Sequence, residues 1–190
     1  MNCTINSASH FSGLQVGISP ISLVQLAGSV RKFNLNRPFI LPILLQSLVE
    51  AEFGDSAGGE RIARIRDWIF ERFRYAAEGS NSQTTAVDTF VRRQGVCRDF
   101  AHVLIALPRA SSIPARFVSA YAPYFTPQDF HAVAEVYLDH TWHLVDATGM
   151  AASNQIARIG IGLDAAEVSF LSSFGPLMFG NQSVQVRVEE

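Results

Sequence analysis

Cysteine is scarce in this sequence. Only Cys3 and Cys97 occur among its 190 residues, and two cysteines are too few for a disulfide framework. Cys3 lies in a polar N-terminal stretch, so we expect no bridge between the two. Unpaired cysteines are typical of a reducing compartment, and the sequence therefore predicts a cytoplasmic protein.

Long apolar runs and a strong net charge are also missing. No stretch approaches the ~18 consecutive apolar residues that a membrane-spanning helix needs. Residues 1–7 lack the basic and apolar regions of a signal peptide. The formal net charge is −2, whereas proteins that bind nucleic acids or anionic membranes usually carry a basic excess. We therefore expect neither nucleic acid nor membrane as a partner.

The chain is rich in apolar and aromatic residues. Hydrophobic residues make up 48% of it, charged residues 17%, and fourteen residues are phenylalanine. This composition and length fit one globular domain with a sizeable core. Residues 1–19 are rich in Ser, Asn and Gly and predict an irregular lead-in, and residues 20–190 are assigned to a single domain.

Helical patterns dominate the first half of the chain. Residues 38–53 predict a helix with a proline in its first turn. Residues 59–74 predict a second, amphipathic helix. Its apolar face consists of Ile62, Ile65, Trp68, Ile69 and Phe73. Thr84 or Thr85 is expected to cap a third, short helix, whereas the pattern of residues 20–33 fits a helix or a strand.

From residue 115 the pattern changes to the period of two that is typical of strands. Strands are predicted at residues 115–121, 130–138 and 141–146. Asp139 and His140 are expected to form the tight turn of a hairpin that joins the last two of these strands.

Two further strands are predicted near the C-terminus, at residues 155–161 and 182–188. Asp164 is expected to cap a short helical turn between them, and the glycine pair at residues 160–162 is interpreted as a turn. Helices that come first, with antiparallel strands after them, predict an α+β fold in which the N-terminal helices pack on one face of an antiparallel β-sheet.

Cys97 follows Gly95 and stands at the expected start of an apolar helix. The N–H groups and the dipole at a helix N-terminus favour negative charge, and therefore the reactive thiolate. Pro108 is expected to end this helix. A lone cysteine in an apolar helix is more often inert core material, so a catalytic interpretation requires a base and an orienting group.

The predicted hairpin offers both groups. With its turn at residues 139–140, His131 faces about Thr148, and Asp146 lies one diagonal step away, within side-chain reach. Asp146 can then hold one ring nitrogen of His131 and leave the other for the Cys97 thiol. This is the nucleophile–base–orienter arrangement of thiol enzymes, although spacing alone does not place the helix over the hairpin.

Other polar residues have structural interpretations. His102, one turn into the apolar helix, is expected to be a structural hydrogen-bonding group. Asp99 is expected to cap that helix or to stabilise the preceding loop. His140 and His143 lie near the hairpin turn, but no cysteine pair or HExxH motif accompanies them. We therefore predict no metal site and no cofactor.

Three motifs, in this order, resemble the transglutaminase-like superfamily, and most of all its bacterial members. They occupy residues 95–102, residues 113–119 with 129–132, and residues 142–148. The resemblance covers about residues 59–175, and we assign this stretch as the core of the domain.

The resemblance implies a papain-like α+β core with a catalytic cysteine at a helix N-terminus. In that family pattern Cys97 is the nucleophile, His131 the base and Asp146 the orienting group. The backbone N–H of Cys97 forms one part of the oxyanion hole. For the second donor, which lies upstream in such sites, the candidates are Tyr75 and Gln94.

Three functions are compatible with these residues. The first is a cysteine protease or amidase that hydrolyses peptide, isopeptide or small amide bonds. The second is a transglutaminase, in which an amine instead of water accepts the acyl group. The third is a catalytically silent binding module that keeps the fold. The sequence favours hydrolysis, and it leaves the substrate and the oligomeric state open.

Overall fold

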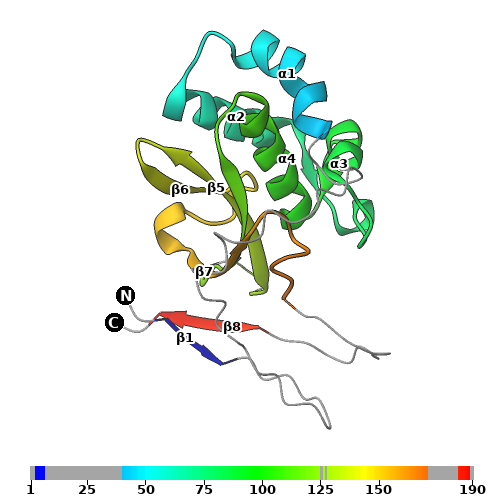
Figure 1. The fold of residues 1–190 in the computed structure, drawn as a ribbon. Coiled ribbons are helices and arrows are strands. Elements are labelled where there is room, and N and C mark those ends of the chain that lie inside the picture. The colour runs from blue at the N-terminus through cyan, green and yellow to red at the C-terminus, as the bar shows by residue number, and fades with distance from the viewer. Residues whose placement is uncertain (1–2, 7–39, 125, 127, 171–183, 189–190) are drawn as a thin grey trace.

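The structure is a computed structural model, and it describes residues 3–6, 40–124, 126, 128–170 and 184–188 (Figure 1). The helices are α1 (Ile40–Phe53), α2 (Gly58–Arg72), α3 (Ala86–Arg92) and α4 (Cys97–Ala110), with short 3-10 turns η2 (Ala77–Gly79) and η3 (Ser153–Gln155). The strands are β1 (Cys3–Asn6), β2 (Arg74–Tyr75), β3 (Gln94–Gly95), β4 (Ala115–Tyr121), β5 (Phe130–Leu138), β6 (Thr141–Val145), β7 (Ala157–Gly162) and β8 (Gln185–Val188).

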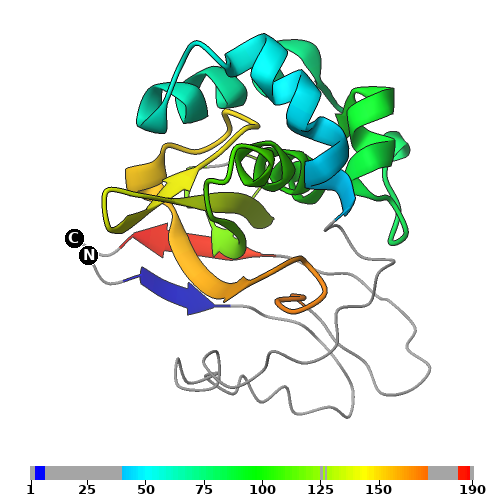
Figure 2. The ribbon, with the colours of Figure 1, turned by 45° about the horizontal axis from the view of Figure 1, so that its top comes forward.

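The largest sheet is antiparallel and has the strand order β6-β5-β4-β7. Helix α4 packs on one face of this sheet, and α1, α2 and α3 lie around α4 on the same side (Figure 2). The β1–β8 pair lies on the side away from these helices. The predicted α+β architecture, with the helices on one face of an antiparallel sheet, is therefore confirmed.

Helix α4 is the centre of the main core. Its side chains Val103, Leu104 and Leu107 are almost completely buried. They share one apolar cluster with residues of α1, α2 and the sheet. On the sheet, β5 contributes the small side chains Ala132 and Ala134 to this cluster. An apolar helix that is covered on nearly all sides belongs in the middle of a domain, as the sequence predicted.

The chain reaches α4 through α3 and a short parallel strand pair. The Thr85 side chain accepts a hydrogen bond from Asp88 N, and the Asp88 carboxylate accepts one from Thr85 N, which forms a capping box. The expected Thr85 cap is thereby confirmed. Arg93 ends α3 in the left-handed conformation, with φ 55°. The chain then turns into β3, which pairs with β2 and leads directly to Cys97.

Helix α4 extends further than expected. The end predicted near Pro108 is wrong, because the helix continues to Ala110. Proline removes one N–H donor from the helical ladder, but here it stands in the last turn. The Pro108 carbonyl accepts hydrogen bonds from Ser111 N and Ile113 N, both at 2.9 Å. Pro108 therefore removes one backbone hydrogen bond near the end of the helix. The free energy gained by burying the apolar face of α4 is larger than this loss.

Gly160 and Gly162 lie within β7, so the turn predicted for them is wrong. The chain turns instead at residues 163–168 and folds back over the strand. A Cβ atom on Gly160 would lie 3.2 Å from the Val168 side chain, and one on Gly162 would lie 2.9 Å from Glu167. These glycines allow the close approach of the following turn, which is a common reason for glycine in a strand.

The stretch of residues 1–19, predicted to be an irregular lead-in, contains β1, so that prediction is wrong for Cys3–Asn6. Strand β1 pairs with β8 from the other end of the sequence. Local composition carries no signal for a partner so distant along the chain. The prediction for residues 20–33 lies outside the described residues, and the strand predicted at 182–188 is described from Gln185 onward.

Among the residues that the structure describes, no helix combines the length and apolar character needed to span a membrane.

Leu104→Ala tests the central position of α4. Leu104 is completely buried, and removing such a side chain costs about 2–5 kcal/mol of unfolding free energy. Thermal denaturation should show a Tm lower by roughly 5–15 °C. Val91→Ala is the matched control, because Val91 is 71% exposed on α3 and its truncation should be nearly neutral. Equal Tm values for the two variants would contradict this core assignment.

Candidate active site

The β5–β6 hairpin brings His131 and Asp146 together. Its turn has positive φ angles at Asp139 and His140, 47° and 64°, as two-residue hairpin turns require. The register predicted from this turn is confirmed. The strand pairing ends at Val145, and the next residue places Asp146 Oδ2 2.9 Å from His131 Nε2. His131 is 1% exposed and Asp146 8%, so this hydrogen bond is shielded from water.

The Asp146 carboxylate is held by four donors. Its Oδ1 accepts hydrogen bonds from Thr148 N and Thr148 Oγ1, both at 2.7 Å. Its Oδ2 accepts from His131 Nε2 at 2.9 Å and from Ala151 N at 3.0 Å. A carboxylate with all its main acceptor positions in use has a fixed orientation. Asp146 therefore presents one defined oxygen to His131.

Cys97 is the first residue of α4, and its thiol is free and half-buried. The Cys97 side chain interacts with His131, and this interaction is one of those that raise the pKa of the imidazole. Cys97, His131 and Asp146 therefore lie in one chain of contacts. The structure supplies the step that the sequence alone did not, because it places the helix N-terminus beside the hairpin.

The electrostatics of the site favour a positively charged imidazole. Burial by itself would lower the pKa of His131, but the hydrogen bond to Asp146, the interaction with Cys97 and the charges of both groups raise it to about 9. Burial by itself would raise the pKa of Asp146, yet the hydrogen bond and charge of His131 and the bonds from Thr148 lower it. An imidazolium held by a buried carboxylate beside a cysteine is the form expected in an activated thiol site.

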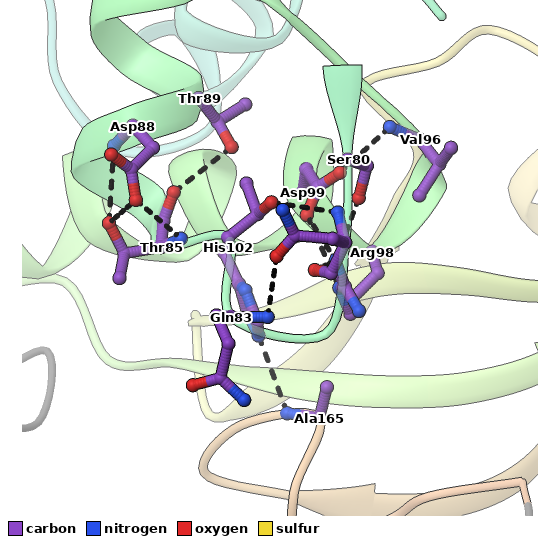
Figure 3. Close-up of polar contacts among 12 residues, drawn as sticks. Ser80, Gln83, Thr85, Asp88, Thr89, Val96, Arg98, Asp99, His102 and Ala165 are labelled. Atoms are coloured by element: carbon purple, nitrogen blue, oxygen red, sulfur yellow. Dashed lines mark hydrogen bonds and ion pairs between the residues drawn. The ribbon is translucent and has the colours of Figure 1, made fainter. Parts of the chain in front are cut away.

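Asp99 and Arg98 hold the turn that carries Cys97 (Figure 3). Asp99 is fully buried, and its Oδ2 accepts a hydrogen bond from Val96 N at 2.9 Å. Its Oδ1 accepts one from Arg98 Nη2 at 2.9 Å. Arg98 also donates to Ser80 Oγ at 2.8 Å and to the Asn81 carbonyl at 2.7 Å. Both expected roles of Asp99, as a helix cap and a loop stabiliser, are therefore confirmed.

Gly95 is necessary for this arrangement. A Cβ atom at position 95 would lie 2.7 Å from both the Cβ and the Oδ2 of Asp99. Any larger residue would therefore push the buried carboxylate away from the helix start. Steric contact with Asp99 therefore explains why position 95 is glycine, in addition to the place of Gly95 in the motif.

The two candidate oxyanion donors lie in different surroundings. Tyr75 is paired with Gly95 in the short parallel ladder, and its hydroxyl interacts with both the backbone and the side chain of Cys97. Burial and the charge of Cys97 raise the pKa of Tyr75 to about 12, so the hydroxyl keeps its proton. Gln94 instead pairs with Arg74, and its Oε1 accepts a hydrogen bond from Arg74 Nη2 at 2.8 Å. The structure brings Tyr75, and not the Gln94 amide, to Cys97.

His102 has its own set of partners. His102 Nε2 accepts a hydrogen bond from Ala165 N at 3.4 Å (Figure 3). The His102 ring also packs against Phe117. Burial lowers the pKa of His102, which keeps the ring neutral and able to accept this bond. Its structural role is therefore confirmed. The described residues hold no group of three or more side chains arranged to bind a metal ion.

Sequence reasoning missed Thr148 and Arg98. A threonine two residues after a strand-ending aspartate is a recognisable signal, because such side chains often bond to one another within a tight turn. Arg98 carries no such signal. Its partners Ser80 and Asn81 lie 18 and 17 residues earlier in the chain.

The region that contains this cluster matches a known family. The model of the transglutaminase-like superfamily matches residues 47–147, which include Cys97, His131 and Asp146. The chain belongs to the transglutaminase-like superfamily. The match begins and ends earlier than the resemblance at residues 59–175, so all of α2 and the second half of α1 are part of the transglutaminase-like region.

Two relatives illustrate this membership. A candidate cysteine protease from Cytophaga hutchinsonii, solved as a crystal structure, is 41% identical with a TM-score of 0.74, over 77% of this chain and 51% of that one. An uncharacterized protein of Mycobacterium leprae (strain TN) is 23% identical over 134 residues, 60% of this chain and 47% of that protein. This transglutaminase-like chain thus spans about half the length of these two relatives.

The charge on His131 can be measured directly. In an NMR titration of ring-labelled histidines, His131 should titrate with a pKa of about 9, well above the ordinary value of ~6.5. Asp146→Asn should lower this pKa, because a neutral amide no longer stabilises the imidazolium. The signal is assigned by its loss in His131→Gln. An ordinary His131 pKa, or one that Asp146→Asn leaves unchanged, would contradict the described electrostatics.

Proposed function

We propose that this chain is a thiol hydrolase, a cysteine protease or amidase that cleaves peptide, isopeptide or small amide bonds through a thioester on Cys97. The observation that carries the proposal is the chain of contacts from Cys97 through His131 to Asp146. The 41% identical relative described as a candidate cysteine protease supports it. The cytoplasmic location expected from the sequence remains a prediction.

The acylation step uses each of the three residues. The Cys97 sulfur, as a thiolate, attacks the substrate carbonyl carbon and forms the C–S bond, while the C=O electrons move to oxygen. When the C=O bond re-forms, the C–N bond breaks, and His131 donates its proton to the departing nitrogen. Because His131 Nε2 faces Asp146, Nδ1 is the nitrogen that exchanges this proton. Asp146 keeps the ring in this orientation.

The negative oxygen formed in this step requires hydrogen-bond donors. The Cys97 N–H lies at the start of α4, where backbone donors and the helix dipole favour negative charge. The Tyr75 hydroxyl lies beside the same N–H and the same sulfur. We infer that Tyr75 is the second donor of the oxyanion hole.

Deacylation decides between hydrolysis and transfer. Water attacks the thioester carbonyl carbon while His131 takes a proton from this water. The C–S bond then breaks, the acid product leaves, and Cys97 returns as the thiolate beside a protonated His131. Tyr75, which interacts with Cys97, is 43% exposed, and Cys97 itself is half-buried. We infer from this exposure that solvent reaches the thioester carbonyl. This access favours water as the acyl acceptor, whereas a transglutaminase must bind an amine in preference to water.

Selective alkylation tests the activated thiol. At pH 6, iodoacetamide should label Cys97 faster than Cys3, and His131→Ala should remove most of this difference, because the imidazolium no longer stabilises the thiolate. Peptide mapping by mass spectrometry gives both rates in one sample. Equal, slow labelling of the two cysteines that does not depend on His131 would support a catalytically silent module instead.

The acyl acceptor is tested with a glutamine-containing peptide and casein, each with and without a biotinylated alkylamine. The proposal expects ammonia release or peptide cleavage that the amine changes little, with no product from Cys97→Ser. Amine incorporation at the expense of hydrolysis would identify a transglutaminase.

Tyr75→Phe tests the oxyanion donor. With p-nitrophenyl acetate, the burst of nitrophenolate reports acylation of Cys97, and loss of one oxyanion donor typically slows such a step about 100-fold. Gln94→Ala is the matched comparison from the neighbouring strand and should change the burst only slightly. A larger effect at Gln94 than at Tyr75 would reverse the assignment.

A further inference from the structure

The position of Asp146 depends on a loop, because β6 ends one residue before it. Ladder hydrogen bonds therefore do not fix its backbone. The next residue, Ala147, is buried in the main core, and Thr148 bonds to the Asp146 carboxylate. Beyond this point the loop turns sharply at Gly149, which has φ +68°. That turn allows Ala151 N to reach back to Asp146 Oδ2 at 3.0 Å.

The turn at Gly149 lies directly under an aromatic ring of another element. A Cβ atom on Gly149 would lie 2.7 Å from Phe70 Cε2 and 3.1 Å from Phe70 Cδ2. The Phe70 ring therefore rests on the glycine backbone, and no side chain fits between them. Position 149 has two independent reasons to be glycine, the left-handed backbone and the ring above it.

Phe70 is not needed for the packing of its own helix. The buried stripe of α2 consists of Ile62, Ile65, Trp68 and Ile69. Phe70 follows this stripe but is 54% exposed. A large aromatic residue left half in solvent gains little from the core, so its contact with Gly149 is the interaction that accounts for its position.

Helix α2 offers a rigid support for such a contact. Trp68, two residues before Phe70, packs against the rings of Phe53, Phe73 and Phe90. The Arg93 guanidinium lies 4.4 Å from the centre of the Trp68 ring. The backbone that carries Phe70 is thus held by an aromatic cluster, and the Gly149 turn is held by Phe70.

We propose that Phe70 is a positioning residue, whose ring clamps the Gly149 turn and thereby keeps Asp146 in the orientation that His131 requires. This inference rests on the proposed function of Cys97, His131 and Asp146. Without the ring, the turn loses its outer support while the Asp146 hydrogen bonds remain. Asp146 then samples other orientations, and the imidazolium and the thiol it activates are less well stabilised.

The test compares Phe70→Ala with Phe70→Tyr, which keeps the ring, in a Cys3→Ser background. Phe70→Ala should move the NMR titration of His131 to lower pH, in the direction of Asp146→Asn but by less. It should slow acylation by p-nitrophenyl acetate roughly three- to thirtyfold, below the ~100-fold cost of a 1 Å misplacement. Phe70→Tyr should retain the wild-type titration and rate. Val91→Ala, which removes another exposed apolar side chain, from α3, should do the same.

Gly149→Ala gives an independent check of the contact. Its added methyl group meets the Phe70 ring, so this variant should also shift the His131 titration. Phe70→Ala combined with Gly149→Ala should be no worse than Gly149→Ala alone, because the clash is gone and the two effects are not additive. Additive losses in the double variant would show that the two residues act separately.

The outcomes distinguish this inference from the proposed function. Phe70→Ala could leave the His131 titration and the acylation rate unchanged while Asp146→Asn alters both. The positioning role proposed for Phe70 would then be wrong, and the proposed thiol-hydrolase function would be unaffected. If Asp146→Asn and His131→Gln also leave acylation unchanged, the proposed function itself fails. A lower Tm of Phe70→Ala with an unchanged His131 titration would mean that Phe70 only stabilises the fold.

Discussion

The hydrogen bond between His131 Nε2 and Asp146 Oδ2 is the interaction on which the rest of the site depends. It is 2.9 Å long and buried, and both groups reach it only because a two-residue turn fixes the hairpin register. A buried imidazole would otherwise lose its proton, since burial disfavours the charged form. The bond reverses this preference and leaves the opposite side of the ring for Cys97. Its position therefore determines which residue could act as the nucleophile in the proposed reaction.

Two separate supports position Cys97 and Asp146 on either side of His131. On the helix side, the buried Asp99 and the Arg98 guanidinium fix the first turn of α4 around Gly95. On the sheet side, the loop after β6 folds around the Asp146 carboxylate. The fold thus holds a charged cluster at the junction between a central helix and the sheet, and the apolar core behind it keeps the two parts from separating.

The sequence predicted those parts that local rules determine. The limits of β4 and β5, the turn at residues 139–140 and the Thr85 cap follow from alternation, turn chemistry and capping, which act over a few residues. The β1–β8 pair and the contacts of Arg98 with Ser80 and Asn81 were not predicted, because their partners lie far apart in the chain. The helix beyond Pro108 was missed for another reason: tertiary burial outweighed a local helix breaker.

The central claim is that Cys97 forms a covalent acyl-enzyme with the help of His131. The most direct measurement is to mix the protein with p-nitrophenyl acetate, quench it in acid within the burst, and locate the acetyl group by mass spectrometry. The account predicts acetyl on the peptide that contains Cys97, and little or none there in His131→Gln. Equal acetylation of Cys97 in both proteins, or acetyl groups found only on other side chains, would contradict it.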